Sequence, residues 1–419
     1  MMHVLYLNYH LSGGAAIAAT RLYDSLPKDQ VNGTFSFIEG EPPDETYREI
    51  VSNERFSREI GNRLRRTLLR KKVKYYLKRR PGKYEIFTYP CLHFKTDYSI
   101  LNSNPDILHL HWVAGFMDYP SFFSSLPESM PIVWTLHDMN PFTGGCHHSD
   151  DCEKYTRQCE ECPQIGHSSP GDLSAQGFQI KLDALKDKNL HVVAVSRWLQ
   201  EQAERSAIFS SAKSFQTVHL GLDVNQFKPF SREESRRNFG IKTDNTVLLF
   251  GANKVDNWRK GYSFLVEALN IIKLQGELTL VVFGGETTKL SLPDNVEMMN
   301  VGYVGSPEKL AELYSAADLF IMPSICESFP QTCLEAMACG VPVVAFKAGG
   351  IPEIICSGET GLLAETKNSH DLAEKIQWMI NHPDERQKMG NNARYHMEQN
   401  FTLKQQTDKY MSLYGAMLT

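Results

Sequence analysis

Two carboxylates stand beside the start of a helix predicted over Gln331–Ala338. Glu327 precedes this helix and Glu335 lies about one and a half turns inside it, so the two cannot share a proton. A helix start presents free backbone N–H groups and a positive dipole end, which attract anions. The residues at this start are Phe329, Pro330, Gln331 and Thr332. The pattern indicates an anion site beside two separate hydroxyl-binding carboxylates, and solvated surface acids are the alternative for an isolated pair.

Three cations lie in an earlier loop, between a predicted strand and a predicted helix. They are Lys254, Arg259 and Lys260. Cations placed at a strand end can stabilise negative charge that grows on a phosphate. Downstream, Gly349 and Gly350 form a second turn, and glycine lets the backbone approach a ligand closely. For Lys254 a solvated loop cation is the alternative.

The amino-terminal half carries weaker chemical signals. Gly13 and Gly14 follow the first predicted strand and precede a helix, but such a pair also fits tight packing of a helix on a strand. His137 ends a predicted strand, at the edge where ligands of parallel sheets bind. A structural histidine is the alternative reading. His109 and His111, near another strand end, are further candidates for lining the same edge.

Four of the nine cysteines fall within seventeen residues and have the spacing C-x5-C-x6-C-x2-C. They are Cys146, Cys152, Cys159 and Cys162. The final Cys-x2-Cys is a good half of a tetrahedral zinc site, while the wider first half is unusual. A structural zinc ion is the predicted occupant, and a set of free thiols in a long loop is the alternative.

Apolar runs with the pattern of strands alternate with helical patterns along the 419 residues, which predicts an α/β fold with doubly wound parallel sheets. The predicted strands are 3–8, 35–38, 107–111, 132–137, 191–196, 214–220, 247–250, 278–283, 296–301, 319–323, 343–346 and 361–364. The turn-rich sequence around Gly221 predicts a hinge between two domains. We therefore expect one domain over 1–210, a second over 211–392, and helices over 393–419 that cross back to the first.

The segment 323–365 resembles the signature of the retaining GT-B glycosyltransferases of family 4. The resemblance rests on the E-x7-E pair, the following AMACGVPVV and the glycine turn GGIPE. It implies that Glu327 faces the transferred sugar and that Glu335 binds the ribose of a nucleotide. It also implies that Gly349 and Gly350 lie near that nucleotide.

The cation loop matches this family in part. The resemblance implies an Arg and a Lys, six residues apart, against the departing diphosphate. Lys260 matches the Lys. Lys254 stands where the family has Arg, and a lysine cannot form the two parallel hydrogen bonds that an arginine makes with a phosphate. The spacing does not decide whether Arg259 supplies the phosphate contact that is lost at Lys254. The resemblance further implies that His137 lies close to the donor sugar and that the Gly13–Gly14 loop approaches the diphosphate.

The resemblance implies the GT-B architecture, in which two Rossmann-like domains face a cleft and bind the acceptor (1–210) and the donor (211–392). It implies that a hexose passes, with retention, from a nucleotide diphosphate sugar to a glycan or polyprenyl-pyrophosphate-linked acceptor. The Cys-rich loop 140–165 is similar to that of bacterial exopolysaccharide enzymes of the colanic-acid type. No cofactor is expected for catalysis. The alternatives are a GT-B-shaped epimerase or phosphorylase, or a non-catalytic nucleotide-sugar-binding protein.

The net charge of −5 hides a strong asymmetry. Residues 55–83 carry thirteen Lys or Arg and one acid, and Phe56, Ile60, Leu64 and Leu68 recur there at four-residue spacing. This pattern predicts a basic amphipathic helix that binds an anionic membrane surface through 55–80, whereas no nucleic-acid-reading motif accompanies it. A solvated charge run is the alternative. The sequence starts as a strand without a signal-peptide pattern. We therefore expect a cytoplasmic protein, peripheral at the inner face of the plasma membrane.

Overall fold

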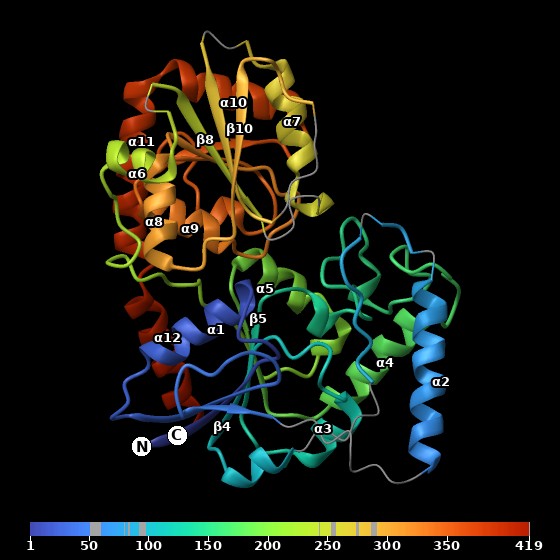
Figure 1. The fold of residues 1–419 in the computed structure, drawn as a ribbon. Coiled ribbons are helices and arrows are strands. Elements are labelled where there is room, and N and C mark those ends of the chain that lie inside the picture. Colours follow the sequence, from blue (N-terminus) through green and yellow to red (C-terminus); the bar gives the residue numbers. More distant parts are fainter. Residues whose placement is uncertain are drawn as a thin grey trace. The chain divides into compact units, whose positions relative to one another are not determined.

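The computed structural model describes residues 1–50, 60–78, 80–82, 84–91, 98–242, 244–252, 257–273, 276–285 and 291–418, with side chains of 60–66, 98 and 99 excepted. The chain forms two compact units (Figure 1). Unit 1 consists of Met1–His219 and Thr407–Thr419, and unit 2 of Leu220–Gln406. The structure thus divides the chain at His219 and Gln406, where the sequence predicted boundaries at 210 and 392.

Unit 1 is built on a parallel sheet with the strand order β3-β2-β1-β4-β5-β6-β7. Its strands are β1 (Met2–Leu7), β2 (Val31–Phe37), β3 (Tyr47–Glu49), β4 (Ile107–Leu110), β5 (Ile132–Leu136), β6 (Leu190–Ala194) and β7 (Ser214–Thr217). Its helices are α1 (Gly14–Ser25), α2 (Ile60–Leu77), α3 (Tyr119–Ser125), α4 (Leu173–Leu185) and α5 (Arg197–Glu204). The apolar runs of β1, β4 and β5 are buried because helices cover both faces of such a sheet.

Unit 2 is built on a second parallel sheet, in the order β10-β9-β8-β11-β12-β13. Its strands are β8 (Thr246–Ala252), β9 (Leu278–Gly284), β10 (Val296–Gly302), β11 (Leu319–Met322), β12 (Val343–Phe346) and β13 (Gly361–Ala364). Its helices are α6 (Arg232–Phe239), α7 (Tyr262–Ile271), α8 (Pro307–Ala316), α9 (Gln331–Ala338), α10 (Ser369–Asn381) and α11 (Pro383–Asn400). The predicted pair of Rossmann-like doubly wound sheets is confirmed.

The last helix, α12 (Leu403–Met417), returns the chain to the core of unit 1. Tyr410 and Tyr414 are fully buried there, in one cluster with Tyr6, Tyr23 and Phe35. Their ring area contributes a large share of the apolar burial in this core.

In each sheet the chain adds strands first toward one edge and then toward the other. The change of direction lies between β1 and β4 in unit 1 and between β8 and β11 in unit 2. In doubly wound sheets, ligands bind beside the carboxyl ends of the strands at such a point. The loops that follow these strands therefore position the candidate site residues.

The predicted basic helix exists as α2, but its apolar stripe differs from the prediction. The side chain of Leu68, which was expected in the stripe, is 56% exposed. Leu69, Val73, Tyr76 and Leu77 instead pack against buried residues of unit 1. The neighbour is α4, and the two helices lie side by side in Figure 1. Phe56 lies outside the described residues, as do the side chains of Ile60 and Leu64.

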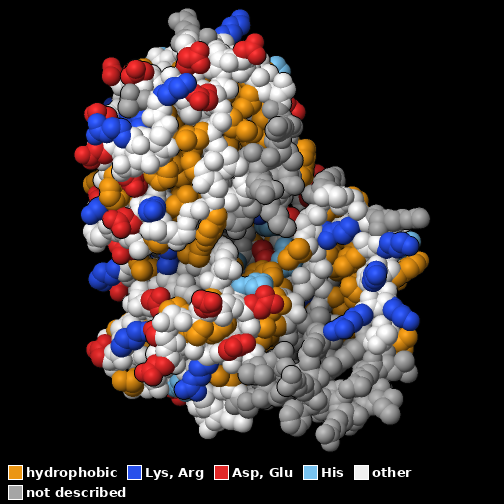
Figure 2. Space-filling model, viewed as in Figure 1, with side chains coloured by type: hydrophobic (Ala, Val, Ile, Leu, Met, Phe, Trp, Pro, Cys, Tyr) orange, Lys and Arg blue, Asp and Glu red, His pale blue; other side chains and the backbone are white. Residues whose placement is uncertain are grey.

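The outer face of α2 remains cationic. Figure 2 shows blue Lys and Arg side chains among orange apolar ones over this helix. From Thr67 to the residue after the helix, the exposed residues are Thr67, Leu68, Arg70, Lys71, Lys72, Lys74, Tyr75 and Lys78. Across the described residues, none of the helices has the length and apolar character of a membrane span.

Candidate functional site

Glu327 and two cations meet at the switch point of the unit 2 sheet. Lys260 and Arg259 end the 3-10 turn that follows β8, and Glu327 lies in the loop after β11. Lys260 Nζ lies 2.6 Å and Arg259 Nη1 lies 2.9 Å from the same oxygen, Glu327 Oε1. The Glu327 carboxylate is 11% exposed. The structure thus brings three predicted site residues into direct contact across 67 positions of sequence.

The backbone holds these side chains tightly. Arg259 Nη1 also donates to the carbonyl oxygen of Cys326 at 2.8 Å, and the N–H of Ile325 donates to the carbonyl of Arg259. Gly261 has φ +70°, and a Cβ there would lie 1.8 Å from the carbonyl oxygen of Pro323. Only glycine therefore allows the two loops to approach this closely. The side chain of Asn257 accepts from the N–H of Arg259 and caps the turn.

The predicted glycine turn supports Glu327 from its other side. The N–H of Gly350 donates to the carbonyl oxygen of Glu327 at 2.9 Å. Gly349 has φ +58°, and a Cβ there would lie 2.0 Å from the same oxygen. The turn after β12 is thereby tied to the loop after β11, so a ligand at Glu327 would also meet this glycine backbone.

α9 begins at Gln331, directly after Pro330, whose missing N–H costs nothing at this position. Phe329 is buried, whereas Gln331 and Thr332 are partly exposed. The start of the helix lies on the same loop as Glu327, as the sequence predicted, and it provides a region of positive dipole potential.

Glu335 lies inside α9 and does not join the Glu327 group. Its carboxylate is buried and accepts a hydrogen bond of 3.2 Å from the hydroxyl of Tyr314 on α8. Burial and the nearby carboxylate raise the pKa of Tyr314 well above its usual value, so this hydroxyl stays a donor. Tyr314 was not predicted, because its role depends on α8 packing beside α9 and no local pattern shows this.

In unit 1, the predicted residues gather near the β1–β4 switch point. Gly13, with φ +89°, caps α1, and Gly14 is the first residue of this helix. His137 follows β5 and is partly exposed, and its Nε2 lies 3.1 Å from Nδ1 of His111. Desolvation lowers the pKa of His137 to about 4, against a smaller opposing effect of Asp138. His137 is therefore a neutral hydrogen-bonding group at neutral pH.

His111 and His109 are both buried, with pKa values well below the usual value because of desolvation and their neighbouring histidines. His111 lines a small hollow within unit 1 together with His137, and its place along a ligand-binding edge stays a prediction. For His109 that prediction is wrong. Its Nδ1 and Nε2 are bonded to Tyr414 Oη and Thr135 Oγ1, each at 2.7 Å, in the core of unit 1.

Asp138, which follows His137, anchors the Cys-rich loop. Its Oδ2 accepts from Trp112 Nε1 and from Nδ1 of His147, each at 2.7 Å. Nε2 of His147 in turn lies 2.9 Å from the hydroxyl of Thr88. Burial raises the pKa of Asp138, but His147, His148 and the N–H of Asn140 together outweigh it, so the net pKa is lowered and the carboxylate stays charged. His147 thereby ties the loop to Asp138 and to Thr88.

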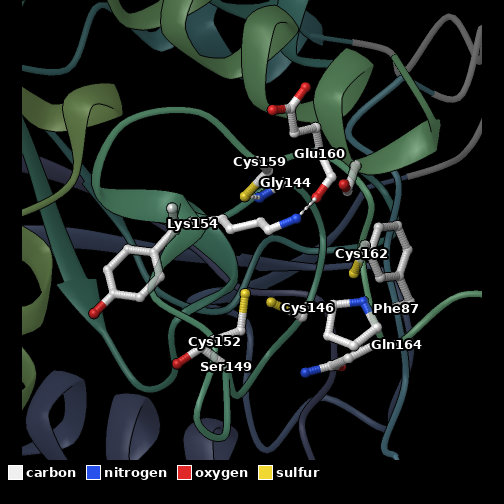
Figure 3. A pocket seen from close by; sticks show the side chains of 13 residues that line it. Phe87, Gly144, Cys146, Ser149, Cys152, Lys154, Cys159, Glu160, Cys162 and Gln164 are labelled. Atoms are coloured by element: carbon white, nitrogen blue, oxygen red, sulfur yellow. Dashed lines mark hydrogen bonds between the residues drawn. The ribbon is translucent and has the colours of Figure 1, made fainter. Parts of the chain in front are cut away.

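All four cysteines of the loop 140–165 line one hollow (Figure 3). Cys146, Cys159 and Cys162 are buried and Cys152 is partly exposed. Burial raises the pKa of the Cys159 thiol to about 12 and that of Cys162 to about 11. Lys254, the remaining predicted residue, lies outside the described residues.

Comparison with known proteins agrees with this geometry. Residues 231–396, within unit 2, match the family model of group 1 glycosyl transferases. The match covers most of unit 2 and none of unit 1. The chain is 32% identical over 196 residues to D-inositol 3-phosphate glycosyltransferase of Thermobifida fusca, covering 43% of this chain and 45% of that protein. It thus spans less than half the length of this relative. It is 29% identical to N-acetyl-alpha-D-glucosaminyl L-malate synthase of Bacillus anthracis, covering 80% of this chain and 82% of that protein.

Solved structures match over the whole chain. Sucrose-phosphate synthase from Thermosynechococcus elongatus has a TM-score of 0.71 and 19% identity, covering 100% of this chain and 99% of that one. HepE of Anabaena in complex with UDP-glucose has a TM-score of 0.65 and 19% identity, covering 99% and 100%. The chain has the GT-B fold. At these identities the likeness extends to the fold alone.

Proposed function

We propose that this protein is a retaining glycosyltransferase that uses a nucleotide diphosphate sugar. The observation that carries the proposal is the cluster of Arg259, Lys260 and Glu327 at the β8–β11 switch point, inside the segment that matches group 1 glycosyl transferases. Such an edge is where doubly wound sheets bind nucleotides. The complex of HepE with UDP-glucose, a protein of the same fold, supports this class of donor.

The cations would stabilise the leaving group. As the bond between the anomeric carbon and the phosphate oxygen breaks, negative charge grows on the departing diphosphate. Lys260, Arg259 and the start of α9 provide positive potential that is already oriented when the reaction begins. Without a donor, Glu327 is the counter-ion of both cations. A bound diphosphate would take over part of that role and leave Glu327 to hold the sugar.

Retention follows if the acceptor attacks the face that the diphosphate leaves. In that path the acceptor oxygen bonds to the anomeric carbon while its proton moves to the departing phosphate oxygen. No protein base is then required, and the enzyme acts by positioning. Glu335, already oriented by Tyr314, would hold the ribose, and neutral His137 would hold a sugar hydroxyl.

The acceptor is proposed to be a lipid-linked glycan of bacterial surface polysaccharide synthesis. The support is the cationic outer face of α2, which displays Leu68 and Tyr75 among its charges, each 56% exposed. The opposite face is fixed to unit 1. α2 would therefore lie on an anionic membrane as a rigid cationic surface, and its packed stripe would not insert into the lipid.

Turnover tests the catalytic proposal. Lys260→Ala removes a cation from the leaving group, and kcat should fall by about 100- to 1,000-fold. Glu335→Gln should raise KM for the donor with a smaller effect on kcat, because a charged hydrogen bond to the ribose is lost in the ground state as well. The matched control is Lys309→Ala, on the exposed surface of α8, which should leave both constants unchanged.

The products distinguish the alternative activities. A transferase yields a glycosylated acceptor whose anomeric configuration, read by NMR, equals that of the donor. An epimerase would change the donor without an acceptor, and a phosphorylase would require inorganic phosphate. If no donor were consumed across a panel of nucleotide sugars and lipid-linked acceptors, the chain would be a binding protein and the proposal would fail.

Co-sedimentation with vesicles tests the membrane proposal. Each exposed cation near an anionic leaflet contributes about 1 kcal/mol, so replacing Lys71, Lys74 and Lys78 by Gln should weaken binding by about 100-fold. The control replaces an equal number of exposed lysines elsewhere, namely Lys309, Lys388 and Lys404. Equal loss in both triple variants would show a general effect of charge and refute a docking role for α2.

A further inference from the structure

The hollow lined by the four cysteines has features that the proposed transfer reaction does not use. It lies within unit 1, in the loop that follows β5, and the close view shows all four thiols around it (Figure 3). All four cysteines are free, and three of them are buried. A hydrophobic core contains an occasional buried cysteine. Four thiols from seventeen residues around one hollow are more than core packing explains.

Backbone donors point at the sulfur atoms. The N–H of Gly144 donates to Cys159 Sγ at 3.3 Å, and the N–H of Gln164 donates to the sulfur of Cys162, two residues before it. Sulfur in a neutral thiol is a weak acceptor, whereas a thiolate accepts such bonds well. A Cβ on Gly144 would lie 2.2 Å from the carbonyl oxygen of Ser174, so this close approach depends on glycine.

Two cations interact electrostatically with these cysteines. Lys181 is fully buried, and its ammonium donates to neutral oxygens, which include the carbonyls of Asn140 and Thr143. It interacts electrostatically with Cys146 and Cys159. Asp138, which also interacts electrostatically with Lys181, is already engaged by His147, so an anionic centre at the sulfur atoms would compensate the buried ammonium further.

Arg80 is the second cation. It interacts electrostatically with Cys162 and Cys146, and its buried Nε has no hydrogen-bond partner among the described residues. Four thiolates around one divalent ion carry a net charge of about −2, and Lys181 and Arg80 together supply the opposite amount.

We propose that Cys146, Cys152, Cys159 and Cys162 bind a structural zinc ion. As placed in the described part of the chain, no three His, Cys, Asp or Glu side chains are yet arranged as a metal-binding group. Binding therefore requires the thiols to rotate into the hollow that they already line. Zinc accepts four thiolates in tetrahedral geometry, and a closed set of this kind is structural because no open position is left for a substrate.

The ion would support α2. Cys146 and Cys162 belong to the buried cluster against which Leu69, Val73 and Tyr76 of this helix pack. The N–H of Gly166, just beyond the last cysteine, donates to the carbonyl oxygen of Tyr76 at 2.7 Å. Closing the loop on zinc would therefore fix the surface on which the cationic helix rests.

Metal analysis of the full chain, purified without a metal-binding tag, tests this proposal. The wild type should contain about one zinc per chain, and Cys159→Ser with Cys162→Ser should lower that content at least about ten-fold. The matched control is Cys91→Ala, which removes a buried thiol of the same cluster that does not line the hollow, and it should keep the metal.

A second measurement covers the case in which the double variant fails to fold. Wild type refolded with Co²⁺ should show sulfur-to-cobalt charge transfer and the intense visible bands of a tetrahedral site. Wild type purified without zinc, showing no such spectrum and carrying four thiols that alkylate freely, would overturn the proposal. Disulfides among these four cysteines, found by mass spectrometry of the native protein, would overturn it as well.

Discussion

The three neighbouring histidines of unit 1, His109, His111 and His137, should make its stability decrease as the pH falls. His137 has a folded-state pKa of about 4 against 6.5 for a hydrated histidine, so the unfolded chain takes up a proton that the folded chain does not. The contribution is fully present above pH 6.5 and is lost as the pH falls toward 4. Between pH 7 and pH 5, His137 alone should lower the free energy of unfolding by about 2 kcal/mol. His109 and His111, with pKa values well below 6.5, add losses in the same direction.

The loss assigned to His137 alone is already a sizeable part of the stability of about 5–15 kcal/mol that is typical of folded domains. Hydrogen exchange by mass spectrometry, read on peptides from β4 and β5 at pH 7 and pH 5 after correction for intrinsic rates, measures this loss within unit 1. His137→Asn keeps a hydrogen-bonding group beside His111 but cannot titrate. It should reduce the pH dependence by about 2 kcal/mol. An unchanged pH dependence in this variant would refute the reasoning.

Two further changes probe particular contacts. Gly349→Ala places a Cβ 2.0 Å from the carbonyl oxygen of Glu327 at φ +58°, so it should cost at least about 1 kcal/mol of stability and also lower kcat by displacing Glu327, whereas a normal kcat would contradict the role of this turn. Tyr414→Phe removes the hydroxyl that joins Tyr6 and His109, each at 2.7 Å, and should lower the free energy of unfolding in urea by about 1–3 kcal/mol, which an unchanged midpoint would disprove.

Much of the fold could be predicted because its signals are local. A buried strand such as β8, with the sequence TVLLFGA, is a continuous apolar run, and its position before a glycine-rich or charged loop marks a strand end. The order of strands within the sheet is not local. The contact between Lys260 and Glu327 exists because the chain places β11 beside β8, and periodicity cannot show this.

The missed features have a common physical reason, namely partners that are distant in sequence. α6 escaped prediction because it is a polar helix in which Ser235 and Arg236 are the buried residues, and Arg236 is held by Asp318, 82 positions later. His109 resembled a site residue because its partner Tyr414 lies 305 positions away. Likewise, the stripe of α2 was assigned to Leu68 because no local pattern shows which side of a basic helix meets α4.

The return of α12 to unit 1 has a consequence for synthesis on the ribosome. Unit 2 is a continuous stretch of chain, so all its strands are available for folding once Gln406 has emerged. Unit 1 begins earlier but lacks Tyr410 and Tyr414 until the whole of unit 2 has been translated, and until then His109 has no Tyr414 hydroxyl to bond. One face of its sheet therefore stays uncovered until α12 has been synthesised. Unit 1, whose synthesis begins first, is expected to finish folding last.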